Sequence, residues 1–86
     1  MEVNMDKIIT ATGKEFDCDY LTVRHSSNRA FIRVIAPIET VASVFYNKAE
    51  TAKLTYCGET LTGYTKFVSI INEGDAFKVS LEKEGE

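Results

Sequence analysis

The fold is decided by residues 15–36, which read EFDCDYLTVRHSSNRAFIRVIA. Two runs rich in β-branched and aromatic residues flank the polar residues 25–28, and this pattern is typical of a β-hairpin. If Arg24 pairs with Arg29, one face of the hairpin collects the apolar side chains Leu21, Val23, Ala30, Ile32 and Val34. A slip of one residue would turn all of them toward solvent, so this register is the predicted one. Asp19 falls on the apolar side, which predicts a bulge or an exposed strand end there.

The rest of the chain predicts four more strands and one helix. Strand character is seen in residues 6–12, 53–57, 60–72 and 76–83. Pro37 stops the second strand of the hairpin and suits the first turn of a helix over residues 38–47, after which residues 47–51 indicate a polar connector. The order β-β-β-α-β-β-β predicts an α+β domain. Its sheet would be mostly antiparallel, or a partly open barrel, with about six strands and one short helix.

The last three strands predict a meander with two-residue turns at residues 58–59, of type II′, and at residues 73–74. The second turn would pair Ile70 with Phe77 and place both on the face covered by the helix. The opposite face would then carry Thr65, Phe67, Ser69, Ile71, Lys78 and Ser80. This face is less polar than solvent normally requires, which predicts that something covers it.

Length and net charge restrict the number of domains and the kinds of partner that we expect. The 86 residues fit one domain, with residues 1–5 and 83–86 as predicted frayed ends. A net charge of −3 argues against nucleic acid and against an anionic membrane surface as partners, because both attract basic proteins. No signal peptide is recognisable, and no apolar run approaches the ~20 residues that cross a bilayer. We therefore expect a cytoplasmic protein with two reduced cysteines, and a Cys18–Cys57 disulfide is the alternative.

No group of residues predicts catalysis. His25 is the sole histidine, and its neighbours Ser26 and Ser27 share a loop with it, which is not a catalytic geometry. Cys18 and Cys57 both lie near acidic residues, and negative charge disfavours the reactive thiolate. The cysteines and the histidine also lack the short paired spacing of zinc sites. We predict a protein that is not an enzyme and has no metal, cofactor or small-molecule substrate.

The most suggestive surface is the polar face of the hairpin, which carries Tyr20, Arg24, Arg29, Phe31 and Arg33. Arginine and aromatic residues are enriched in protein interfaces, so this face predicts a protein partner. Phe67 and Ile71 of the meander would extend it. Two alternatives stay open. The face could be an ordinary exposed one with a Tyr20–Arg33 cation–π pair, or its aromatic rings could stack on single-stranded nucleic acid.

Several short strings resemble small prophage-encoded proteins of Gram-positive bacteria. They are residues 7–16, Pro37-Ile38-Glu39, Leu54-Thr55-Tyr56 and Gly63-Tyr64-Thr65-Lys66. The resemblance implies a structural or assembly component, or a small inhibitor, rather than an enzyme. We thus predict a non-enzymatic protein-interaction module that self-associates or binds other phage proteins, in the cytoplasm or within a phage particle. The alternative is a phage-encoded binding or inhibitory factor that acts on a host protein.

Overall fold

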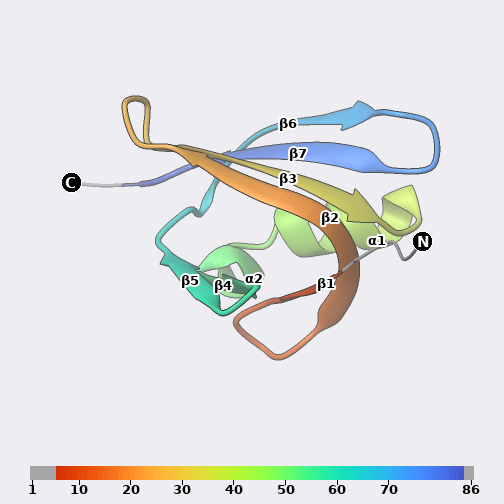
Figure 1. Cartoon of the computed structure of the whole chain (residues 1–86), viewed down its shortest axis with the longest axis horizontal. Helices are drawn as coiled ribbons and strands as arrows, with labels where there is room; N and C mark the ends of the chain where they lie inside the picture. Colours follow the sequence, from red (N-terminus) through yellow and green to blue (C-terminus); the bar gives the residue numbers. More distant parts are fainter. Residues whose placement is uncertain (1–5, 85–86) are drawn as a thin grey trace.

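The computed structural model describes residues 6–84, which form one seven-stranded antiparallel sheet with two short helices (Figure 1). The strands are β1 (Asp6–Ile9), β2 (Glu15–Arg24), β3 (Arg29–Ile35), β4 (Lys53–Tyr56), β5 (Glu59–Thr62), β6 (Lys66–Asn72) and β7 (Phe77–Glu82). The helices are α1 (Ile38–Phe45) and α2 (Lys48–Thr51). The strands lie in the order β5-β4-β1-β2-β3-β7-β6. This architecture confirms the predicted α+β class and its antiparallel sheet.

The β2–β3 hairpin has the predicted register. Tyr20 pairs with Arg33 and Arg24 with Arg29, and the ladder shifts between Cys18 and Tyr20, which is a bulge, the first of the two alternatives predicted at Asp19. Before the bulge, residues 15–18 of β2 pair with β1, whereas β3 pairs with residues 17–24. Figure 1 shows β2 curving from the β1 side of the molecule toward β3. The bulged strand therefore joins the two halves of the sheet, since a bulge bends the strand that carries it.

The predicted three-stranded meander is wrong, because residues 60–72 form two strands rather than one. The β4–β5 hairpin lies at one edge of the sheet and the β6–β7 hairpin at the other. Between them Gly63 has a φ of 84°, a conformation that glycine adopts most easily, and its N–H donates to the carbonyl of Ala52 at 3.1 Å. The glycine ends the β4–β5 ladder and sends the chain across to the other edge.

Both predicted meander turns also shift. Cys57 and Gly58 have φ values of 53° and 79°, and Tyr56 pairs with Glu59, so the two-residue loop is Cys57-Gly58. Two positive φ values define a type I′ turn rather than the predicted type II′. The β6–β7 loop has four residues, 73–76, and it pairs Ile70 with Val79 instead of Phe77.

The predicted connector after the first helix contains a second helix, α2. The side chain of Asn47 accepts a hydrogen bond from the backbone N–H of Ala49 at 3.0 Å, which caps the start of α2. The helix α1 ends at Phe45, two residues before the predicted end, and Asn47 instead begins the next helix.

The core lies between the helices and one side of the sheet. Val41, Val44 and Phe45 of α1 are buried, and they face the sheet residues Ile8, Ala30, Ile32, Val34, Leu54, Val79 and Leu81. Figure 1 shows both helices on the same side of the β2-β3-β7-β6 part of the sheet. The other side of these four strands, here named the open face, has no helix over it within residues 6–84.

The chain end at residues 83–84 is hydrogen-bonded, although the sequence placed it in a frayed tail. The N–H of Lys83 donates to the carbonyl of Asn28, and the N–H of Glu84 donates to the carbonyl of Gly63. Residues 1–5 and 85–86, the rest of the predicted frayed ends, lie outside the described residues.

Glu50 of α2 fastens the loop between β1 and β2. Its Oε1 accepts hydrogen bonds from the hydroxyls of Thr10 and Thr12, both at 2.6 Å, and its Oε2 lies 3.2 Å from Nζ of Lys14. These hydrogen bonds, with the lysine as a smaller contribution, lower the pKa of the Glu50 carboxyl to about 2. The ionised carboxylate is thus part of the folded state.

We expect the free energy of unfolding to fall as the pH drops from about 5 to about 2, because Glu50 has a lower pKa in the folded than in the unfolded chain, where it is about 4.3. Glu50→Gln should lower the stability at pH 7 and flatten this acid-induced loss. The measurement is urea unfolding at several pH values, and Glu59→Gln, at an exposed position of β5, is the control. An unchanged acid slope in Glu50→Gln would contradict the role of Glu50.

Candidate functional site

The open face is a regular array of twelve side chains. Strand pairing places residues that lie directly opposite one another on the same face, so the ladders define three rows across β2, β3, β7 and β6. The first row is Tyr20, Arg33, Lys78 and Ile71. The middle row is Thr22, Phe31, Ser80 and Ser69. The third row is Arg24, Arg29, Glu82 and Lys66.

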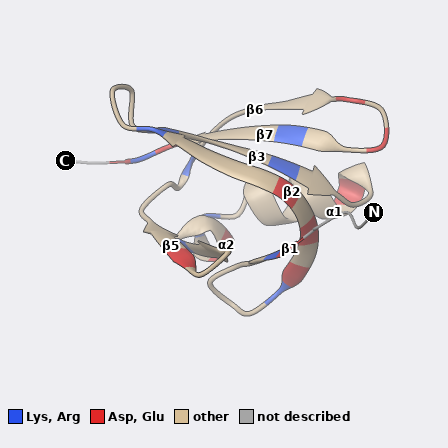
Figure 2. Ribbon diagram, in the orientation of Figure 1, with Lys and Arg blue, Asp and Glu red and all other residues tan. Residues whose placement is uncertain are grey.

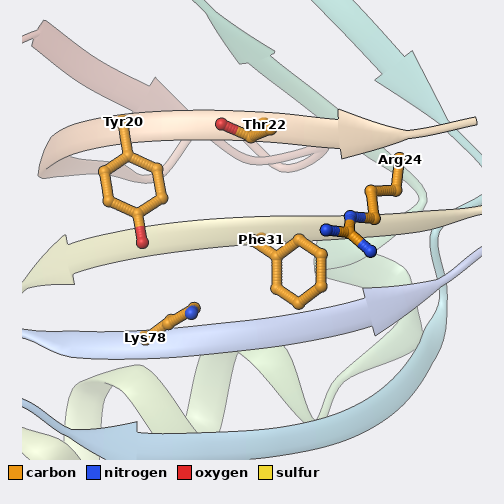
Figure 3. Close-up of a pocket in the computed structure, with 5 residues that line it drawn as sticks. All are labelled: Tyr20, Thr22, Arg24, Phe31 and Lys78. Carbon is orange, nitrogen blue, oxygen red and sulfur yellow. The ribbon is translucent and has the colours of Figure 1, made fainter.

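The part of the open face formed by β2, β3 and β7 is concave around Thr22 and Phe31 of the middle row. A shallow hollow of about 380 Å³ lies there, lined by Tyr20, Thr22, Arg24, Phe31 and Lys78 (Figure 3). Figure 3 shows the Phe31 ring between the side chains of Arg24 and Lys78. The Lys78 Nζ lies 5.3 Å from the ring centroid of Phe31, which is cation–π distance. The hollow thus combines an aromatic surface with cationic groups on two sides.

Most of the other charged side chains on the open face form ion pairs. The carboxylate of Glu82 forms ion pairs with Arg29, at 2.6 Å, and with Lys66, at 3.6 Å. Arg33 pairs with Asp19 at the bulge and, through Nε, with Glu73 of the β6–β7 loop at 3.0 Å. Figure 2 shows basic segments of β3 and β7 side by side, whereas the acidic segments of β2 lie toward its bend.

Arg24 and Lys78 are different from these paired cations. Within the described part of the chain, neither has a carboxylate within ion-pair distance. Both line the hollow. The acidic side chains near this face already form ion pairs with Arg29, Arg33 and Lys66. The hollow is therefore a locally cationic site in a chain whose net charge is −3.

The structure brings together six of the seven residues predicted as an interaction surface. Tyr20, Arg24, Arg29, Phe31, Arg33 and Ile71 all lie on the open face. In place of the Tyr20–Arg33 cation–π pair, which was an alternative for this face, the guanidinium of Arg33 forms ion pairs with two carboxylates. Thr22 and Lys78 belong to the hollow but were not predicted for this surface. Recognising Lys78 required knowing that β7 lies beside β3.

Phe67 does not belong to the open face, and this part of the prediction is wrong. The β6–β7 ladder shifts between Phe67 and Ser69, so Phe67 pairs with Leu81 on the core side. There its ring meets Tyr46, which follows α1, with centroids 4.3 Å apart. A bulge inserts one extra residue and reverses the alternation of side chains beyond it. Val68, which lies inside the bulge, is exposed.

The potential catalytic groups stay far from a reactive geometry. His25 is exposed in the loop of the β2–β3 hairpin. Cys18 and Cys57 are free thiols; burial raises the pKa of Cys18 to about 11, and the hydrogen bond from Cys57 Sγ to Asp6 raises the pKa of Cys57. No group of three His, Cys, Asp or Glu residues within residues 6–84 is placed to hold a metal ion. These thiols lack the low pKa of a nucleophile.

Comparisons with known proteins do not identify a family for this chain. A scan against protein-family models, a search of curated proteins and a search of solved structures each found no match for this chain. The resemblance to prophage-encoded proteins therefore stays a prediction. Neither helix in the described part of the chain is long and apolar enough to cross a membrane.

Replacing Phe67 and Ile71 separately by Ala tests which face each occupies. We expect Phe67→Ala to lower the free energy of unfolding by about 1–3 kcal/mol, because it removes a half-buried ring from the core side. Ile71→Ala should change it by less than about 1 kcal/mol, since 49% of Ile71 is exposed. Urea unfolding measures both, and equal losses would mean that the bulge is misplaced.

Proposed function

We propose that this chain is a non-enzymatic protein-binding domain whose interface is the open face of β2, β3, β7 and β6. The observation that carries the proposal is the hollow, where Phe31 lies between two cations that have no ion pair among the described residues. Aromatic and arginine side chains supply much of the binding energy in protein interfaces. Here they stand on paired strands, which hold them in place before a partner arrives.

The face is a better candidate for binding than the neighbouring β6 edge of the sheet. The strand β6 is an edge strand, and its bulge between Phe67 and Ser69 disturbs the regular ladder. Bulges on edge strands are a common way in which proteins prevent pairing with another sheet. The open face carries no comparable obstacle.

The resemblance to prophage-encoded proteins supplies the biological setting of the proposal. In that setting the domain is a structural or assembly component that binds another phage protein or a second copy of itself. A binding or inhibitory factor would use the same face on a host protein. The identity of the captured partner distinguishes these two functions.

The test is photo-crosslinking in cells that naturally produce the protein. A photo-reactive amino acid is placed at position 22, on the floor of the hollow, and in a matched control at position 43, an exposed serine of α1. We expect specific protein adducts from position 22, and few or none from position 43. Adducts of equal yield from both positions, or adducts from position 43 alone, would contradict the proposed interface.

A further inference from the structure

We infer that the hollow on the open face binds a short acidic peptide segment, with carboxylates on Arg24 and Lys78 and an apolar or aromatic side chain against Phe31. This inference rests on the proposed function and adds the chemistry of the partner. It rests on the two cations of the hollow, Arg24 and Lys78, which have no carboxylate partner among the described residues.

The charge of the face favours a ligand with few negative groups. The side chains Arg24, Arg29, Arg33, Lys66 and Lys78 bring five positive charges, and Asp19, Glu73 and Glu82 bring three negative ones. The excess of two positive charges corresponds to Arg24 and Lys78. Two carboxylates would neutralise it, and an arginine can hold a carboxylate with two parallel hydrogen bonds.

The size of the face also points to a peptide segment. Four strands span about 14 Å across the sheet, and residues 20 to 24 span about 13 Å along it. This footprint is well below the ~800 Å² that each partner buries in a standard interface between folded proteins. A segment of about five extended residues is long enough to cross it.

Geometry sets the spacing of the two acids. Arg24 and Lys78 are two strands apart and lie in the outer rows, so their Cα atoms are roughly 16 Å apart on a diagonal. Both side chains reach inward toward Phe31 (Figure 3). Carboxylates at positions i and i+4 of an extended segment, about 13 Å apart, therefore reach both cations. The residue between them would lie over the Phe31 ring.

Single-stranded nucleic acid fits these observations less well. Its recognition combines stacking with a row of cations that follows the phosphates, and its affinity depends on how many phosphates are neutralised. On the open face Arg29, Arg33 and Lys66 are already neutralised by carboxylates. Two remaining cations in an acidic chain suit two carboxylates better than a polyanion.

The experiment follows backbone amide NMR shifts of the full chain during titration with the capped peptide Glu-Ala-Phe-Ala-Glu. The control peptide is Gln-Ala-Phe-Ala-Gln, and a six-residue oligothymidine is the nucleic-acid probe. We expect saturable shifts at amides of β2, β3 and β7 around the hollow with the acidic peptide only. An oligothymidine that binds more tightly than the peptide would overturn the inference, as would equal binding of the Gln peptide.

Matched variants test the two cations. Arg24→Gln and Lys78→Gln should each weaken peptide binding by about fivefold or more, whereas Lys53→Gln, at an exposed lysine of β4, should leave it unchanged. An unchanged amide spectrum without peptide shows that each variant is folded. Equal losses in all three variants would mean that only the overall charge matters, which overturns the site.

The remaining outcomes separate this inference from the proposed function. The same shifts on raising the protein concentration without peptide would identify a second copy as the occupant and overturn the peptide ligand. No saturable shift up to about 5 mM peptide would also overturn it, because the Kd would then lie above about 5 mM, too weak for a specific site. In that case crosslinks from position 22 would still support the proposed function. Their absence would contradict the proposed function, whatever the peptide titration shows.

Discussion

The ion pair between Arg33 and Asp19 holds the point at which the sheet changes direction. Asp19 is the bulged residue of β2, with β1 pairing before it and β3 pairing across it and beyond. Its Oδ1 is buried without a hydrogen-bond partner in the described structure, and burying a charged carboxylate destabilises the folded state. The ion pair between its Oδ2 and Arg33 offsets this loss of hydration. Because Arg33 also reaches Glu73, one guanidinium connects the bend of β2 to the β6–β7 loop.

The same ion pairs determine what the open face can bind. They occupy Arg29 and Arg33, so the cationic character that remains is concentrated at Arg24 and Lys78 beside Phe31. The two helices are short and lie on the core side, which leaves this array uncovered within residues 6–84 (Figure 1). A small domain thereby keeps a complete core and still presents a rigid, chemically distinct surface.

Local features of the sequence predicted the β2–β3 hairpin and its register, and indicated an irregularity at Asp19, because the apolar pattern and the turn lie within one continuous segment. Five of the seven predicted surface residues share the open face for the same reason, and Ile71 joins them from β6. The position of Phe67 could not be predicted, since it depends on a bulge that the alternation of β6 does not reveal. The separation of β5 from β6 depends on Gly63 and on long-range pairing, so Lys78 and the full hollow were also missed.

The most direct test of this account is a double-mutant cycle on Asp19→Asn and Arg33→Gln, with the free energy of unfolding measured in urea. Asp19 and Arg33 are each about three-quarters buried, with side-chain exposures of 29% and 25%. We expect each single variant to be destabilised and the double variant to be little worse than either, which gives a coupling energy of about 1–3 kcal/mol. Additive losses, with no coupling, would contradict the claim that this pair holds the bend of the sheet.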